Sequence, residues 1–100
     1  MSEGVPNQEA LSKEQVVEIL KHSREDRRVL VRYMDQKEKG FTEARDYLLL
    51  NVEVAEILRD AGILAEAYDR FLDTQDQALN EGDEELAARL LVEAEKLALR

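Results

Sequence analysis

Apolar residues recur every three or four positions along most of this chain, the spacing that places them on one face of an α-helix. The pattern is interrupted at Gly40, Gly62 and Gly82, and glycine is the residue that most often ends a helix. Four helices are therefore predicted, over about residues 12–39, 42–61, 63–80 and 84–99. The fold class is all-α, a four-helix bundle-like domain. Its last two helices form an antiparallel hairpin, because the link between them is short.

The domain organisation follows from where this pattern starts. Residues 1–11 show no helical period and include Gly4, Pro6 and Asn7, so we expect a disordered N-terminal tail. Residues 12–100 are expected to form a single helical domain, since a chain of 100 residues can bury one modest core.

The first predicted helix contains polar residues in the middle of its apolar face. That face is formed by Val16, Ile19, Leu20, Leu30, Val31 and Met34. Ser23 and Arg27 fall within it. Either the helix breaks there, with Ser23 and Asp26 as a second capping box, or one long helix carries a polar notch. We favour the long helix, because the apolar phase is the same on both sides, and we expect Arg27 to meet a carboxylate or carbonyl from another helix or subunit.

The second predicted helix is apolar around more than half of its circumference, which is typical of a central helix or of one covered by a partner. Three further helices of so short a chain can hardly cover it, so we predict a homodimer or an obligate protein partner. The expected apolar partner-binding residues are Leu49, Leu50, Asn51 and Ile57. Asn51 lies near the middle of the apolar arc, where it either sets the register of a helix pair or is a satisfied core asparagine.

The last helical hairpin resembles a tetratricopeptide repeat over about a third of the chain. Gly82, Ala87, Leu91 and Ala94 have the spacing of that repeat's turn glycine and second-helix packing residues. Gln75 and Ala78 depart from its first helix, and no second copy follows at the period of the repeat. The resemblance implies a tight helical hairpin, and no binding residues are carried over from it.

Charge is unevenly distributed along the chain. Residues 1–40 carry eight Lys/Arg and eight Asp/Glu, whereas residues 41–100 carry six and fifteen and so hold the entire net charge of −9. This balance argues against binding to nucleic acid or to an anionic membrane surface. A basic stripe runs along the first predicted helix and consists of Lys21, Arg24, Arg28 and Arg32. It is either a solvated face or a surface that docks acidic groups, from the third helix or from a partner.

Candidate catalytic chemistry is sparse. The chain has no cysteine and a single histidine, and it lacks the common nucleotide-binding, hydrolase and zinc-protease motifs. Glu18, His22 and Glu25 lie within one helical turn of each other and could in principle hold a metal, but we interpret His22 as a surface residue. We therefore expect no enzymatic activity, no cofactor, no metal site and no small-molecule substrate. Without an apolar run long enough to span a membrane, the expected location is the cytoplasm.

These observations favour a non-enzymatic protein–protein interaction module, a small adaptor, chaperone or regulator that acts through its helix faces and self-associates. The alternative is an acidic nucleic-acid mimic that inhibits a DNA- or RNA-binding protein. Its acidic surface would consist of Glu66, Asp69, Asp73, Asp76, Glu81, Asp83, Glu84 and Glu85.

Overall fold

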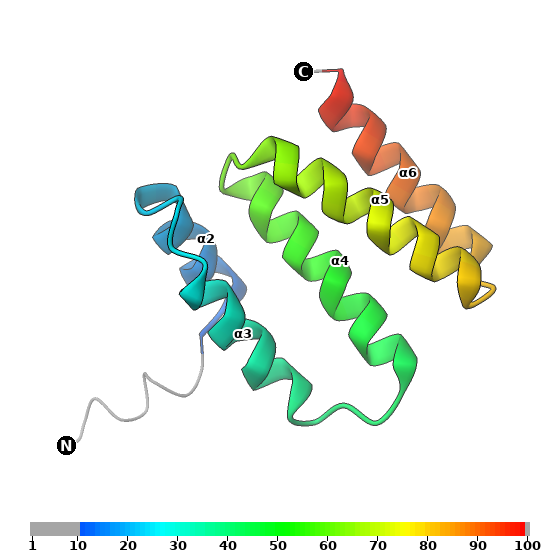
Figure 1. Cartoon of the computed structure of the whole chain (residues 1–100), viewed down its shortest axis with the longest axis horizontal. Helices are drawn as coiled ribbons and strands as arrows, with labels where there is room; N and C mark the ends of the chain where they lie inside the picture. The colour runs from blue at the N-terminus through cyan, green and yellow to red at the C-terminus, as the bar shows by residue number, and fades with distance from the viewer. Residues whose placement is uncertain (1–10, 100) are drawn as a thin grey trace.

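The computed structural model describes residues 11–99, and these form five helices with no strand among them. The helices are α2 (Lys13–His22), α3 (Arg28–Glu38), α4 (Ala44–Asp60), α5 (Leu64–Asn80) and α6 (Glu84–Ala98), as Figure 1 shows. The all-α prediction is confirmed. Residues 1–10 of the predicted tail lie outside the described residues. Leu11 packs against the core, and its N–H donates to Oε1 of Gln36 at 3.1 Å.

The first predicted helix is in fact two helices. α2 ends at His22, and residues 23–27 form a turn before α3 begins. The Asp26 N–H donates to the Ser23 carbonyl at 3.0 Å, and Asp26 Oδ1 accepts the backbone N–H of Arg28 at 3.1 Å. These contacts use backbone groups that a continuous helix would pair internally. The prediction of one long helix was therefore wrong, and the described fold has five helices where four were expected.

The break changes which side chains are buried. The buried side chains of α2 and α3 are Val16, Val17, Leu20, Val29, Leu30 and Tyr33. Ile19 and Val31, which a continuous helix would place on the apolar face, are 38% and 53% exposed. The turn rotates α3 relative to α2, so each helix presents a different set of residues to the core.

Helices α4, α5 and α6 form two successive reversals that share α5 (Figure 1). α4 and α5 pack as a hairpin. Gly62 and Gly82 follow α4 and α5 and adopt φ values of 84° and 80°, a region that favours glycine. At each reversal the residue after the glycine donates its N–H back into the preceding helix, from Ile63 to Leu58 O at 2.9 Å and from Asp83 to Ala78 O at 2.8 Å.

α4 is the central helix of the described fold. Its buried residues are Leu48, Leu50, Val54, Ala55, Ile57 and Leu58. α2 and α3 pack against α4, and so does α5, which also carries the fully buried Phe71. The ion pair between Arg59 and Glu93, at 2.9 Å, adds a link from α4 to α6. No helix of the described part is both long and apolar enough to cross a membrane.

The three glycines of the described residues allow a controlled test of the two turns. A Cβ added at Gly40, Gly62 or Gly82 would meet no atom within 4 Å, so sterics outside the backbone play no part. Only Gly62 and Gly82 have positive φ. We expect Gly62→Ala and Gly82→Ala each to lower the free energy of unfolding by about 1–2 kcal/mol, because a side chain disfavours this conformation. Gly40→Ala, the matched control, should change it by less than about 1 kcal/mol in either direction. Urea denaturation of the three variants measures the difference, and equal losses in all three would contradict it.

Candidate functional site

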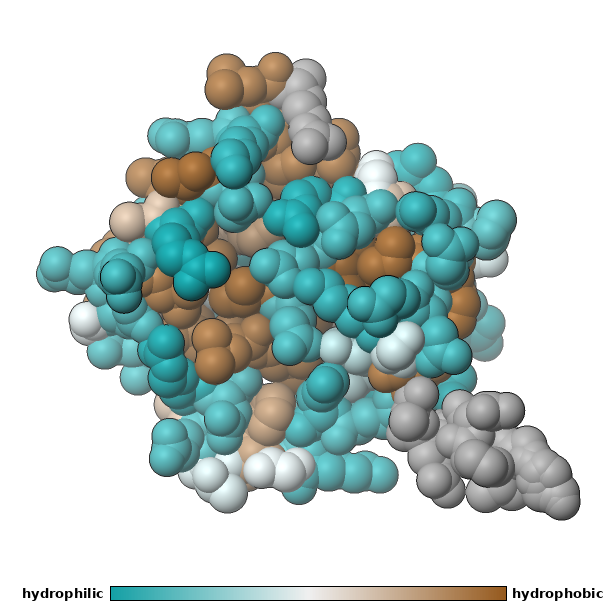
Figure 2. Space-filling model, turned by 180° about the vertical axis from the view of Figure 1, so that it is seen from behind, coloured by the Kyte–Doolittle hydropathy of each residue, from teal (hydrophilic) through white to brown (hydrophobic). Residues whose placement is uncertain are grey.

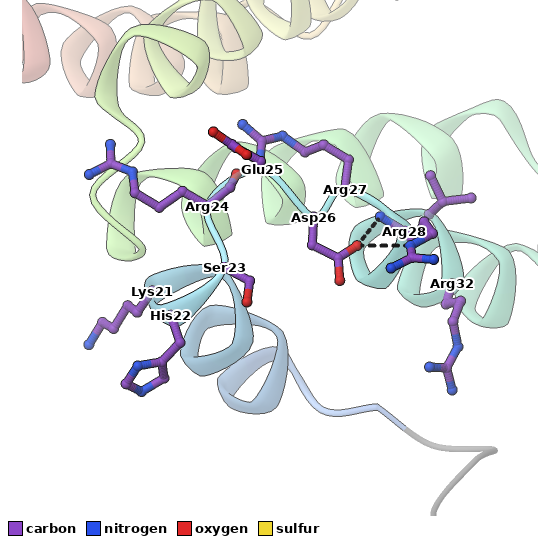
Figure 3. A pocket seen from close by; sticks show the side chains of 10 residues that line it. Lys21, His22, Ser23, Arg24, Glu25, Asp26, Arg27, Arg28 and Arg32 are labelled. Atoms are coloured by element: carbon purple, nitrogen blue, oxygen red, sulfur yellow. Dashed lines mark hydrogen bonds and ion pairs between the residues drawn. The ribbon is translucent and has the colours of Figure 1, made fainter.

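The ends of α2 and α3 and the turn between them surround an open hollow (Figure 3). Its lining residues are Lys21, His22, Ser23, Arg24, Glu25, Asp26, Arg27, Arg28, Val31 and Arg32. We call this surface the basic hollow, since five of its residues are Lys or Arg and two are Asp or Glu. All four residues of the predicted basic stripe line it. The structure thus brings them together around a turn, although the sequence had placed them along one continuous helix.

The cationic groups of the basic hollow point in different directions. Figure 3 shows the side chains of Lys21, His22 and Arg24 extending to one side of the hollow, and those of Arg28 and Arg32 to the other. In this view the cationic side chains diverge and do not converge on one point. The hollow therefore offers positive charge spread around a rim, an arrangement that suits an extended anionic ligand better than a single small anion.

One carboxylate of the lining already occupies the start of α3. Asp26 Oδ1 accepts hydrogen bonds from the Arg28 side chain at 3.2 Å and from the Arg28 backbone N–H at 3.1 Å. The hydrogen bond from the Arg28 side chain has the largest effect and the one from its backbone N–H the next; both lower the pKa of Asp26 below its ordinary value. Asp26 is therefore ionised at neutral pH and fills the position at the α3 N-terminus where an external anion would otherwise bind.

Arg27 lines the basic hollow, and its guanidinium reaches α5. Its Nε and Nη2 donate to the two carboxylate oxygens of Glu66 at 3.2 and 2.7 Å, and Nη1 donates to the carbonyl of Arg24. The hydrogen bond from Arg27 lowers the pKa of Glu66, and the same bond raises the pKa of Arg27. The prediction that Arg27 would find a carboxylate on another helix is confirmed. Arg24 adds a second tie, since its Nη2 donates to the Gly62 carbonyl at 3.1 Å.

The predicted apolar partner-binding residues of α4 do not share one surface. Leu50 and Ile57 are 4% and 0% exposed within the chain itself, whereas Leu49 is 42% exposed. The amide of Asn51 donates to Gln77 Oε1 at 3.1 Å and accepts from Arg70 at 3.3 Å, so Asn51 is satisfied by α5. α2, α3 and α5 pack against α4, whereas Tyr47 and Leu49 remain about half exposed on it. Of the four predicted residues, Leu49 is exposed and Asn51 is half-buried, so these two could be reached by a partner.

Apolar side chains also reach the surface away from the basic hollow. Those on α4, α5 and α6 and just after α6 are Tyr47, Leu49, Leu79, Leu91, Val92 and Leu99. Figure 2 shows apolar groups at several places on the face turned away from the viewer of Figure 1, interrupted by hydrophilic side chains. Leu79, near the end of α5, and Leu91, on α6, are 49% and 38% exposed.

Val31 is the lining residue that the sequence pattern missed. It was placed on the buried face of a continuous helix, yet it is more than half exposed and borders the basic hollow. The available signal was the interruption of the apolar face at Ser23 and Arg27, which marks the turn that exposes Val31.

The described residues contain no group of three His, Cys, Asp or Glu side chains that could hold a metal ion. His22 Nε2 lies 3.9 Å from a Glu18 oxygen, and its side chain is 82% exposed.

Comparisons with protein-family models, with curated proteins and with solved structures find no match to this chain. In the hairpin that resembles a tetratricopeptide repeat, Ala87 and Ala94 are buried, whereas Leu91 is partly exposed.

The pairing of Arg27 with Glu66 can be measured by a double-mutant cycle with Arg27→Ala and Glu66→Ala. Their side chains are 36% and 43% exposed, so solvent screens the pair, and we expect a coupling of about 0.5–1 kcal/mol. Because Arg27 lowers the pKa of Glu66, this stabilisation is present above the ordinary Glu value of 4.5 and is lost as pH falls through the lowered pKa. Thermal denaturation from pH 7 to pH 3 follows the coupling. A coupling that does not change across this range would show that the carboxylate charge plays no part.

Neighbouring leucines of α4 separate a core role from a surface role. Leu50→Asp places a charge in the core and should lower the free energy of unfolding by about 3–5 kcal/mol. Leu49→Asp, one residue away and exposed, should change it by less than about 1 kcal/mol. Denaturant titration gives both values, and light scattering on the Leu49→Asp protein shows whether an assembly depends on this side chain. Equal effects on stability would mean that α4 is not oriented as described.

Proposed function

We propose that this chain is a non-enzymatic protein–protein interaction module, a small adaptor, chaperone or regulator, that binds a partner protein through the basic hollow. The observation that carries the proposal is the gathering of Lys21, Arg24, Arg28 and Arg32 around one open hollow. Such a concentration of charge is unusual in a chain whose net charge is −9. Positive charge on an otherwise acidic protein steers acidic partners toward one place on its surface.

Local charge decides this recognition more than net charge does. At physiological ionic strength, exposed charges are screened over about 8 Å, so a partner that touches the hollow is governed by the nearby side chains. Those side chains comprise five cations, of which Arg27 is already paired with Glu66, and two carboxylates. The net negative charge of residues 41–100 acts mainly while a partner is still approaching, and it disfavours long polyanions such as nucleic acid.

A second copy of this chain is the alternative protein partner. Asp69, Asp73 and Asp76 lie exposed on α5 and carry the charge that the basic hollow would attract. Contact between the hollow of one copy and α5 of the next joins two different surfaces, so it extends into chains unless the geometry closes a ring. We give precedence to a different protein, because two copies with a net charge of −9 each also repel one another.

The acidic nucleic-acid mimic is the second candidate function. The exposed line of Asp69, Asp73 and Asp76 on α5 favours it. Two other members of the predicted acidic surface are engaged within the chain, Glu66 by Arg27 and Asp83 by Arg45. The acidic surface that remains free of these pairs is therefore smaller than the sequence indicates.

The proposed function is tested by reversing charge in the hollow and elsewhere. Arg28→Glu with Arg32→Glu alters the rim, and Lys39→Glu with Arg89→Glu makes the same change in net charge at exposed positions outside it. In affinity capture followed by mass spectrometry, we expect partners that the unmodified protein and the control variant retain and the hollow variant loses. For a captured partner, the hollow variant should associate on the order of tenfold more slowly at low salt, because exposed charges chiefly steer encounter.

Three results would contradict parts of the proposal. Equal capture by both variants would make the basic hollow a solvated surface. Loss of capture after Asp69, Asp73 and Asp76 are changed to Asn, together with competition by duplex DNA, would establish the mimic in its place. Light scattering that shows a concentration-dependent assembly, abolished only by the hollow variant, would identify the partner as a second copy.

A further inference from the structure

We infer that the basic hollow binds an acidic protein segment in which carboxylates flank an apolar side chain, with the apolar side chain seated on Val31. This inference rests on the proposed function and names the chemistry of the partner. It depends on three features of the hollow: the exposure of Val31, the divergence of the cationic side chains, and the carboxylates already in the lining.

Val31 gives the hollow an apolar contact among its charges. It is 53% exposed, and it lies one helical turn after Arg28 and directly before Arg32. An apolar side chain that covers Val31 removes apolar surface of both partners from water, which favours binding. Carboxylates beside that side chain would lie near Arg28 and Arg32. A ligand with charged groups alone would leave Val31 exposed to water, so its binding would lack the free energy gained by burying this apolar surface.

The direction of the cationic side chains indicates an extended ligand. Lys21 and Arg24 extend to one side of the hollow, and Arg28 and Arg32 to the other (Figure 3). A single phosphate is bound tightly when several donors converge on its oxygens. Here it would reach one part of the rim. A segment of polypeptide that crosses the hollow can place one carboxylate on each side and an apolar residue between them.

The composition of the lining argues against nucleic acid as the ligand. None of the lining residues is Phe, Tyr or Trp, the side chains on which unpaired bases stack. Glu25 and Asp26 both lie in the lining and would repel a run of phosphates. Asp26 also occupies the backbone N–H of Arg28, one of the donors that a phosphate at the start of α3 would use. A peptide instead alternates neutral and charged groups, so it can avoid these carboxylates.

The inference is tested on the full chain with three labelled probes, by fluorescence anisotropy at low and at physiological salt. The probes are a short peptide of repeated Glu-Glu-Leu, the same peptide with Ser in place of Leu, and an oligothymidylate of equal charge. We expect the leucine peptide to bind about fivefold more tightly than the serine peptide, because it covers Val31. Val31→Ser should remove this difference. Arg28→Glu with Arg32→Glu should weaken both peptides about tenfold, and Lys39→Glu with Arg89→Glu should not.

Several outcomes would overturn the inference. Equal affinity for the two peptides, or a difference that survives Val31→Ser, would show that Val31 is not the apolar contact. Tighter binding of the oligothymidylate than of either peptide would make the ligand a nucleic acid. Absence of peptide binding, with capture of partners still dependent on the hollow, would reject this partner chemistry and leave the proposed function standing. Circular dichroism of Val31→Ser, an exposed substitution, verifies that its helices are intact.

Discussion

Helix α4 has apolar side chains around most of its circumference, so it has to be covered on more than one side. This requirement governs the rest of the described fold. α5 covers one side by returning directly after Gly62, and the remaining surface needs a second set of apolar residues. One long N-terminal helix would offer only a single stripe. Two shorter helices joined by a turn supply Val16 and Leu20 from one and Leu30 and Tyr33 from the other.

The basic hollow results from the turn that joins the two short helices covering α4. The turn at residues 23–27 interrupts the helix, leaves some of its backbone groups without helical partners and places the polar side chains of this stretch on the protein surface. Arg27 pairs with Glu66 at the surface, and Arg24 donates to the Gly62 carbonyl, so the turn is held against the α4–α5 reversal. Lys21, Arg28 and Arg32 line the rim of the hollow. The same turn also exposes Val31, so the charge and the apolar contact of the hollow have a common origin.

Helix ends marked by glycine could be predicted closely from the sequence, whereas the break between α2 and α3 could not. Gly62 and Gly82 stop a helix through a local backbone preference, and local preferences are visible in a single chain. At Ser23 and Arg27 the apolar period is compatible with both a break and a continuous helix. The choice depends on packing against α4, which is a property of the whole fold. Four of the predicted residues, Lys21, Arg24, Arg28 and Arg32, nonetheless line one hollow, because residues near a turn remain close whichever path the chain takes.

The cover of α4 from its two sides is unequal in extent. α5 packs against α4 and α6 along much of its length, whereas α2 and α3 pack less extensively against α4. Two polar contacts add to their packing: the ion pair of Lys13 with Glu56 at 2.6 Å, and the hydrogen bond from the Tyr33 hydroxyl to Glu53 at 2.6 Å. Amide hydrogens in α2 and α3 should therefore exchange with solvent when these two helices separate from α4, whereas those in α5 should exchange only when the whole domain unfolds. A ligand in the basic hollow would bind the part of the molecule that opens most readily, and its occupancy would be registered as slower exchange in α2 and α3.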